Sequence, residues 1–138
     1  MSANEVQVGG THYRSAYQHW DFVIDADLNY FTGQITKYIS RWRKKNGTQD
    51  LEKAQHFARK YAECLEVVRV PERPRSRWLR QAAAVSFCKE NDLGPAETHI
   101  IMLCAGLQEL TTGTMQEVCT LIDGLLAAEP GRGYVAQD

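Results

Sequence analysis

The sequence predicts an all-α fold: an antiparallel helical hairpin with an N-terminal arm, followed by a small three-helix bundle. Apolar residues recur at steps of three and four along most of the chain, which is the period of an amphipathic helix. Helix caps and breakers fall between these stretches, and no stretch shows the alternation of a strand. At 138 residues the chain has the length of one domain, or of one domain with a small appendage.

The N-terminal part is expected to be an arm that leads into one short helix. Residues 1–14 contain the pair Gly9 and Gly10, which lets backbone amides approach an anion closely or simply gives the arm freedom. Residues 15–26 are rich in aromatic side chains and predict one or two helical turns, with Ser15 as the N-cap.

The hairpin has the strongest helical pattern. Its first helix is expected from Asp27, as N-cap, to Lys45. The apolar positions of this helix are Leu28, Phe31, Ile35, Tyr38, Ile39 and Trp42. The Asn-Gly pair at 46–47 predicts a left-handed C-cap, and Thr48 then caps a second helix that ends near Val68. Because the connection is short, the two helices are expected to lie antiparallel.

Residues 69–75 divide the predicted chain in two. They carry two prolines and no helical period, so we interpret them as a linker between a domain at 1–68 and an accessory helical bundle at 76–138. The bundle is expected to hold three helices at about 76–92, 96–110 and 114–128, and the tail from residue 129 is expected to be loose. Their starting signals are Ser76, Gly94 with Pro95, and a capping box of Thr114 and Glu117.

The charge is unevenly distributed, although the formal net charge is only −1. Thirteen of the sixteen Lys and Arg residues lie between Lys37 and Arg80, against five acids in the same stretch. No acid lies between Asn29 and Gln49. A basic stretch of this kind attracts polyanions, which include the phosphates of nucleotides and of nucleic acids.

Helical spacing arranges part of this charge in two stripes. One stripe is expected on each helix of the hairpin: Lys37, Arg41 and Lys44 on the first, and Lys53, His56 and Lys60 on the second. If the apolar faces pack together, the stripes flank one groove in which Arg and Lys can bind phosphate. The alternative is that they are the solvated faces of two amphipathic helices.

Several site classes are not indicated. The P-loop, the dinucleotide-binding glycine pattern and the protein kinase motifs are absent. No pair of cysteines has CxxC spacing, so the four cysteines are expected to be free thiols that pack as small apolar groups, without a bound metal: Cys64, Cys88, Cys104 and Cys119. Asp21 and Asp25 can share a helix face and hold Mg²⁺ together with phosphates, or can be capping or solvated acids.

The N-terminus shows no signal peptide, and no apolar run approaches the ~20 residues of a membrane span. A cytoplasmic protein without a membrane partner is therefore expected. Aromatic residues are concentrated beside the basic stretch, where they stack nucleotide bases or belong to the core at helical spacing. They are Tyr13, Tyr17, Trp20, Tyr30, Tyr38 and Trp42.

Four segments together resemble a family of small phage proteins long labelled as a domain of unknown function. They read GGTHY (9–13), QHWDFV (18–23), LNYFTGQITKYISRWRKKNG (28–47) and DLEKAQHFARKY (50–61), and the resemblance extends over about residues 8–65. The family includes a nucleotide kinase of lytic coliphages that lacks a Walker motif. That enzyme transfers phosphate from nucleoside triphosphates to dTMP and dGMP, and it forms a large homo-oligomer.

The resemblance implies that this chain is a phage nucleotide kinase-like protein of the host cell cytoplasm, with the same substrates and a homo-oligomeric state. Two positions depart from the family pattern: Gln34 stands where relatives often have Asn, and His19 stands where they usually have Pro. The family motif falls on Gly9, Gly10, His12, Tyr13, Gln18, Gly33, Lys37, Tyr38, Arg41, Lys45, Gly47, Asp50, Leu51, Lys53 and Ala54.

We assign expected roles on this basis. The catalytic candidates, which clamp phosphates or close over them, are His12, Lys37, Arg41 and Lys53. The candidates for binding the nucleotide or its phosphates are Gly9, Gly10, Tyr13, Gln18, Tyr38, Lys45 and Asp50. Asp50 is expected to orient Lys53 or Arg41, or to cap its helix, and His12 is either a proton donor or incidental. Mg²⁺ is a possible cofactor.

Two other functions stay open at this stage. One is a non-catalytic phage module of helices that binds nucleotides or nucleic acid through its basic faces. The other is a protein that binds a host factor through residues 76–138.

Overall fold

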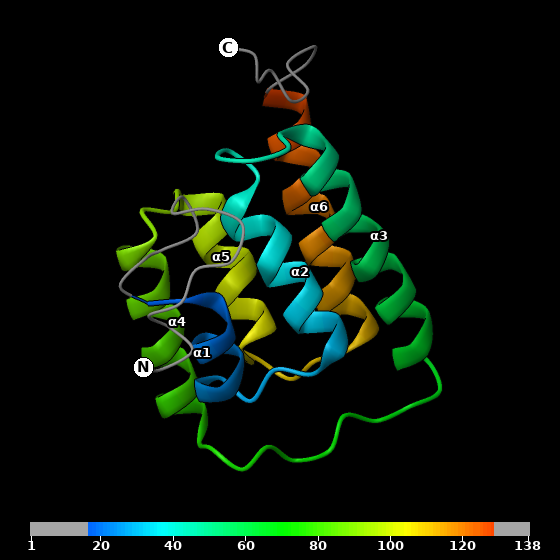
Figure 1. Cartoon of the computed structure of the whole chain (residues 1–138). Helices are drawn as coiled ribbons and strands as arrows, with labels where there is room; N and C mark the ends of the chain where they lie inside the picture. Colours follow the sequence, from blue (N-terminus) through cyan, green and yellow to red (C-terminus); the bar gives the residue numbers. More distant parts are fainter. Residues whose placement is uncertain (1–16, 129–138) are drawn as a thin grey trace.

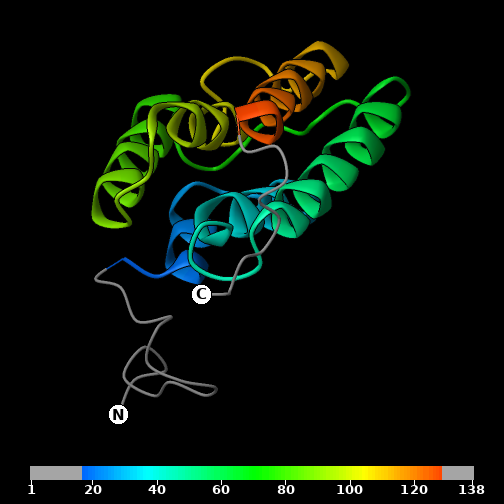
Figure 2. The ribbon, with the colours of Figure 1, turned by 90° about the horizontal axis from the view of Figure 1, so that it is seen from above.

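The protein consists of two stacked layers of three helices each. The computed structural model describes residues 17–128, and within this range all regular secondary structure is helical. The all-α class is therefore confirmed. Figure 1 shows the six helices, and the view in Figure 2 shows one layer above the other. The first layer holds α1 (His19–Asp25), α2 (Tyr30–Arg41) and α3 (Thr48–Leu65), and the second holds α4 (Arg77–Glu90), α5 (Pro95–Cys104) and α6 (Thr112–Ala128).

The layers are in register. Each helix of the second layer packs on one helix of the first: α4 on α1, α5 on α2, and α6 on α3. At the α1–α4 pair, Phe22 and Phe87 stack with ring centroids 4.5 Å apart. Both rings are buried, as are Ile35 of α2 and Ile101 of α5. Helices on both sides of residues 69–75 thus contribute to one core, and the division into a hairpin domain and an accessory bundle stays a prediction.

The start of α2 differs from the predicted one. Asn29, not Asp27, is the N-cap: its side chain accepts from the Thr32 amide, and the Thr32 hydroxyl accepts from the Asn29 amide. Asp27 instead lies just after α1, beyond its C-cap Ala26, with a positive φ of 52°. In this left-handed position the amides of Asp27 and Leu28 bond back to the last turn of α1. The short α1 therefore closes on itself before α2 begins.

Helix α2 also ends earlier than predicted, at Arg41 rather than Lys45. The backbone of 42–46 forms turns, and the Gly47 amide donates to the Trp42 carbonyl. Gly47 has a φ of 61° and is the N-cap of α3, in place of the expected Thr48. Because the helix stops at Arg41, Lys44 does not continue the predicted stripe. Helix α3 likewise ends at Leu65, short of the expected Val68.

The starting signals of the second layer are mostly as predicted. Ser76 caps α4 through its side chain, and Pro95 occupies the first turn of α5. Helix α5 ends at Cys104 instead of near Leu110, because Gly106 (φ 88°) closes it.

The capping box of α6 lies one turn earlier than predicted. Thr111 and Thr114 exchange bonds between their hydroxyls and each other's amides. The expected box of Thr114 and Glu117 is therefore wrong, and Glu117 instead accepts from Gln108.

A buried acid ties the end of α2 to α5. Glu97 is 2% exposed, and its carboxylate accepts from Trp42 Nε1 and from Arg43 Nε, both at 2.9 Å. The indole and guanidinium donors offset the desolvation of this charge. The connection between α2 and α3 is thereby fixed against the second layer. Within residues 17–128, the structure has no helix with the length and apolar character that spanning a membrane requires.

Candidate functional site

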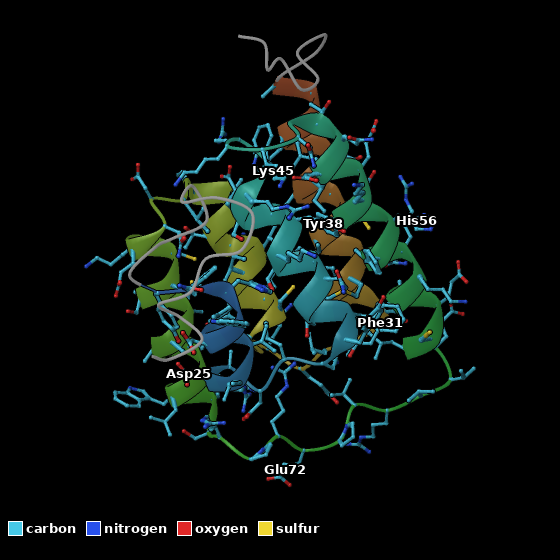
Figure 3. The ribbon with its side chains drawn as sticks, in the orientation of Figure 1. Asp25, Phe31, Tyr38, Lys45, His56 and Glu72 are labelled. Carbon is cyan, nitrogen blue, oxygen red and sulfur yellow. The ribbon has the colours of Figure 1, made fainter. Side chains whose placement is uncertain are left out.

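Three cations surround the ring of Tyr38. Lys37 Nζ, Arg41 Cζ and Lys53 Nζ lie 5.2, 4.9 and 5.4 Å from its centroid. Lys37 and Arg41 are four residues apart on α2, and Lys53 comes from the adjacent α3. The electron-rich ring face attracts cations, which favours this grouping. We call these four residues the Tyr38 cluster; Figure 3 labels Tyr38 on α2.

One member of the cluster has a fixed orientation. Arg41 Nε donates to Asp50 Oδ2 at 3.3 Å, and Asn46 donates to the other carboxylate oxygen at 3.3 Å. The Asp50 side chain is fully buried, whereas 24% of the Arg41 side chain is exposed. Asp50 therefore holds Arg41 from the inside, and the outer edge of the guanidinium remains open to a ligand. Of the two roles expected for Asp50, the contact with Arg41 is the one that the structure shows.

The cluster carries more positive than negative charge. Of the three cations of the cluster, Arg41 is the one that forms an ion pair with Asp50. Neither Lys37 nor Lys53 forms an ion pair within residues 17–128. Both lysines and Tyr38 are half-buried, and electrostatic interactions strengthen as water is excluded. This arrangement is suited to an anion with more than one negative oxygen.

His19 is a neighbour of this site that the motif roles did not include. Its Nε2 lies 2.8 Å from the hydroxyl of Thr36, which in turn donates to the Thr32 carbonyl at 2.8 Å. The Thr36 hydroxyl therefore lies between the His19 ring and the backbone of α2, and the donor in its contact with His19 depends on the tautomer of the ring. Burial, and then the charges of Lys37 and Arg41, lower the pKa of His19 to about 4. One signal in the sequence could have drawn attention to His19: it stands where the family that the chain resembles usually has Pro.

The remaining stripe residues do not join the cluster. Lys44, His56 and Lys60 are exposed, and Figure 3 shows His56 pointing away from the molecule. Lys60 has a weak pairing with Glu63 at 3.9 Å. The predicted groove between two complete stripes is therefore reduced to Lys37, Arg41 and Lys53. For the other three residues, the solvated-face alternative fits their exposure.

The structure does not bring the other predicted site residues into the Tyr38 cluster, or does not describe them. Gly9, Gly10, His12 and Tyr13 lie outside the described residues. Gln18 is the N-cap of α1, where its carbonyl accepts from the amides of Asp21 and Phe22. Lys45 is half-buried in the connection between α2 and α3. These six residues keep their predicted roles as predictions.

Most of the aromatic side chains belong to the packing of the molecule. Phe31 stacks on Tyr61 with ring centroids 5.0 Å apart, and Tyr38 stacks on Phe57 at 6.1 Å. Trp42 is buried and bonded to Glu97. Of the aromatic residues on α2 and α3, Tyr38 is the one that also contacts the cations of the cluster.

The titratable groups elsewhere give no metal site within 17–128, where no three His, Cys, Asp or Glu side chains are grouped to hold an ion. Asp25 accepts from the Tyr17 hydroxyl at 2.7 Å. The four cysteines are free. Burial raises the pKa of Cys88 to about 11 and that of Cys104 to about 12, so both are protonated thiols that pack as small apolar groups, as predicted.

Comparison with known proteins relates part of the chain to one protein family. Residues 11–59 match the model of a family described as a protein of unknown function, DUF3310. No curated protein and no solved structure matches the chain. The matched segment contains α1, α2 and most of α3, and therefore every residue of the Tyr38 cluster. The first layer of this structure is thus similar to a family whose function is not assigned.

Proposed function

We propose that the Tyr38 cluster binds nucleotide phosphates and that the protein is a nucleotide kinase, which transfers phosphate from a nucleoside triphosphate to a deoxynucleoside monophosphate of the dTMP or dGMP type. The observation that carries the proposal is the convergence of Lys37, Arg41 and Lys53 on one half-buried ring. Among residues 17–128 a single carboxylate, that of Asp50, is paired with them. The resemblance to the phage family supports the choice of substrates.

The chemistry requires charge neutralisation more than a protein base. The attacking group is a phosphate oxygen of the monophosphate, which is already largely ionised at neutral pH because its second pKa is about 6. As it attacks, the bond from the γ-phosphorus to the β,γ-bridging oxygen breaks, and a nucleoside diphosphate leaves. The products are two diphosphates. Charge on the transferred group and on the leaving oxygen is what cations stabilise.

The cluster residues are suited to different parts of this task. Arg41 is held by Asp50 and presents a planar pair of donors, which fits two oxygens of one phosphate. Lys37 and Lys53 have no ion-pair partner in the described part of the chain and can follow the charge as it shifts between donor and acceptor. His19 is neutral at pH 7, so it adds no charge but can hold the start of α1 against α2.

The proposal includes further elements that come from the resemblance. Gly9, Gly10, His12 and Tyr13 would close over the phosphates, and Gln18 and Lys45 would line the site. Mg²⁺ would be held mainly by the phosphates, as is common for this ion. The protein would act as a homo-oligomer in the cytoplasm of a phage-infected cell.

The direct test is product formation. Purified protein is incubated with each labelled nucleoside triphosphate and a panel of deoxynucleoside monophosphates, with and without Mg²⁺, and diphosphates are separated and counted. We expect label to appear in the diphosphate of dTMP or dGMP. If none of the combinations yields diphosphate above the level of a heat-treated sample, the kinase proposal is wrong.

The alternative of a non-catalytic binding module predicts a different result. A nucleic-acid-binding surface contacts several consecutive phosphates, so affinity rises with strand length and falls steeply with salt. The Tyr38 cluster is compact instead, because Lys44, His56 and Lys60 do not extend it. Binding of isolated dTMP or dGMP that does not strengthen with oligonucleotide length supports the nucleotide site.

A further inference from the structure

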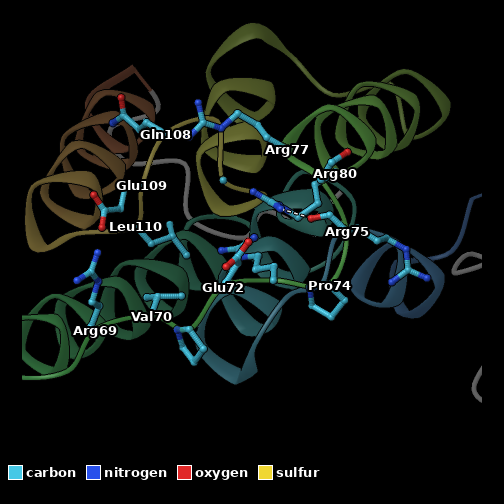
Figure 4. A pocket seen from close by; sticks show the side chains of 14 residues that line it. Arg69, Val70, Glu72, Pro74, Arg75, Arg77, Arg80, Gln108, Glu109 and Leu110 are labelled. Atoms are coloured by element: carbon cyan, nitrogen blue, oxygen red, sulfur yellow. Dashed lines mark hydrogen bonds between the residues drawn. The ribbon is translucent and has the colours of Figure 1, made fainter.

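A second group of cations lies at the crossover between the two layers. The segment from Arg69 to Arg80 runs along one end of the molecule from α3 to α4 (Figure 1). It forms one wall of a cavity of about 860 Å³, and the turn after α5 forms the other (Figure 4). Five arginines line it: Arg69, Arg73, Arg75, Arg77 and Arg80. The lining contains none of the Tyr38 cluster, and we call this cavity the crossover groove.

Three of these arginines are anchored by backbone carbonyls. Arg73 donates to the carbonyls of Cys104 and Ala26, and Arg80 Nε donates to the carbonyl of Ala105 at 2.9 Å. These carbonyls lie at the C-terminal ends of α1 and α5, where helices carry partial negative charge. The anchoring fixes the guanidinium groups in place, but a carbonyl supplies only a partial charge against each full positive one.

Arg75, the third of these arginines, is anchored by a carboxylate as well as by a carbonyl. Its guanidinium donates to Asp27 Oδ1 at 2.7 Å and to the Ile24 carbonyl at 3.0 Å. This is the one carboxylate within 4 Å of any of the five arginines in the described part of the chain. Arg75 is therefore neutralised, and the other four are not.

Arg73 and Arg80 approach each other over Gly106. A β-carbon placed on Gly106 would lie 2.9 Å from Arg80 Nη2 and 3.4 Å from Arg73 Nη1, so both guanidinium groups border the same small space. Burial and the proximity of Arg80 lower the pKa of Arg73. Two like charges this close raise the free energy of the empty groove, and a bound anion would relieve it.

The outer arginines are available. Arg69 and Arg77 are exposed, and neither has a hydrogen bond or ion pair in the described structure. Figure 4 shows them on different sides of the groove, with Arg80 beside Arg75. A ligand that enters the groove would thus find two fixed guanidinium groups and two adaptable ones.

We propose that the crossover groove is a second anion site, which binds a compact, multiply charged phosphate such as an oligophosphate chain. Guanidinium groups bind phosphate oxygens in a bidentate manner, which favours phosphate over a simple halide. The groove lining also contains Glu72 and Glu109, but with five arginines against two acids positive charge predominates. This site is independent of the proposed kinase activity, because it shares no residue with the Tyr38 cluster.

The test measures binding of inorganic tripolyphosphate by calorimetry at low salt, in a Lys37→Ala background that removes a cation of the Tyr38 cluster. Arg69→Gln and Arg77→Gln should each weaken binding about tenfold, which corresponds to the loss of one charge-assisted hydrogen bond. Because neither side chain has a hydrogen-bond or ion-pair partner among residues 17–128, both variants should retain the fold, and circular dichroism checks this. Lys89→Gln, which removes an exposed charge at the far end of α4, should leave affinity unchanged.

The possible results of this experiment distinguish a phosphate site in the groove from a general charge effect and from nucleic-acid binding. Equal affinity in the parent, Arg69→Gln and Arg77→Gln proteins, or no binding in the parent, overturns the groove as a phosphate site. Equal weakening by Lys89→Gln shows a general charge effect and also overturns it. Affinity that grows with oligonucleotide length and exceeds that for tripolyphosphate assigns the groove to nucleic acid instead. Each result leaves the diphosphate assay of the kinase proposal unaffected.

Discussion

The carboxylate of Asp50 is fully buried, and the Nε of Arg41 lies 3.3 Å from it at the edge of the solvent. This contact joins α3 to the last residue of α2. Removal of the two side chains should therefore cost different amounts of stability. Loss of the guanidinium leaves a buried, unpaired carboxylate, whereas loss of the carboxylate leaves a guanidinium that water can reach.

The first prediction follows from that inequality. Arg41→Ala is expected to lower the free energy of unfolding by about 1–3 kcal/mol, since Asp50 keeps only Asn46 as a donor. Adding Asp50→Asn to that variant should recover part of the loss, because it removes the unpaired charge. Urea unfolding of the wild type, both single variants and the double variant measures the coupling. Strictly additive changes would show that the pair does not interact.

The second prediction concerns the two lysines of the cluster. Lys37→Ala and Lys53→Ala should each reduce phosphate transfer by about 10²–10³-fold, a loss typical of one group that stabilises transition-state charge. In the part of the chain that the structure describes, neither residue is paired with an acid, so circular dichroism should remain helical.

The matched control is Lys60→Ala. Lys60 is exposed on α3 and has only a distant contact with Glu63, so its removal changes the net charge equally without touching the cluster. Full activity of Lys37→Ala would remove that residue from the mechanism, and an equal loss in Lys60→Ala would indicate a dependence on overall charge.

Local signals predicted the helices well. Ser76 and Pro95 have conformational preferences that act over a few residues, and each marks a helix start in the structure. The Asn-Gly pair at 46–47 predicts the end of α2, and that prediction is wrong: α2 ends at Arg41, and Gly47 is the N-cap of α3. Where two caps compete, the outcome depends on more distant partners. Asp27 has the side chain of an N-cap, but Arg75 binds its carboxylate and Asn29 caps α2 instead.

The site could be predicted only in part, for the same reason. Spacing on one helix placed Lys37 and Arg41 together, and the short connection brought Lys53 near them. The termination of α2 at Arg41 excluded Lys44. The residues that follow are held by a distant partner, because Trp42 donates to Glu97, more than fifty positions away. The anchoring of Arg73 to Ala26 and Cys104 is likewise a contact between distant segments, for which helical periodicity gives no signal.

The third prediction tests the anchoring role of Arg73. Arg73→Ala should lower the free energy of unfolding by about 1–3 kcal/mol, because the carbonyl of Cys104 loses both of its guanidinium donors. Arg77→Ala, four residues further along and without a hydrogen-bond or ion-pair partner among the described residues, should change it by less than about 0.5 kcal/mol. Urea unfolding compares the two. Equal stability of both variants would show that the crossover is not held by Arg73.

The fourth prediction compares two glycines. Gly106→Ala should destabilise the protein by about 1–2 kcal/mol, because its φ of 88° suits glycine and the new methyl group would meet Arg80. Gly124→Ala, in the middle of α6 with open space around it, should stabilise by about 0.5–1 kcal/mol. Thermal unfolding of the two variants measures whether each substitution lowers or raises the stability. A stabilising Gly106→Ala would mean that the turn after α5 adopts another conformation in solution.

The last prediction is a pH dependence caused by His19. Its folded-state pKa of about 4 lies below the ordinary 6.5, so between these values the unfolded chain binds a proton that the folded protein does not. The contribution of His19 to the free energy of unfolding is therefore fully present above pH 6.5 and falls as the pH drops toward 4, by at most about 3 kcal/mol.

Urea unfolding at pH 7.5, 5.5 and 4.5 is compared between the wild type and His19→Gln. Carboxylates titrate alike in both proteins, so the difference between them isolates His19. That difference should move in favour of the variant as the pH falls, because glutamine keeps a donor near Thr36 without binding a proton. A difference that stays constant across the three pH values would place His19 in contact with solvent and remove it from the interface between α1 and α2.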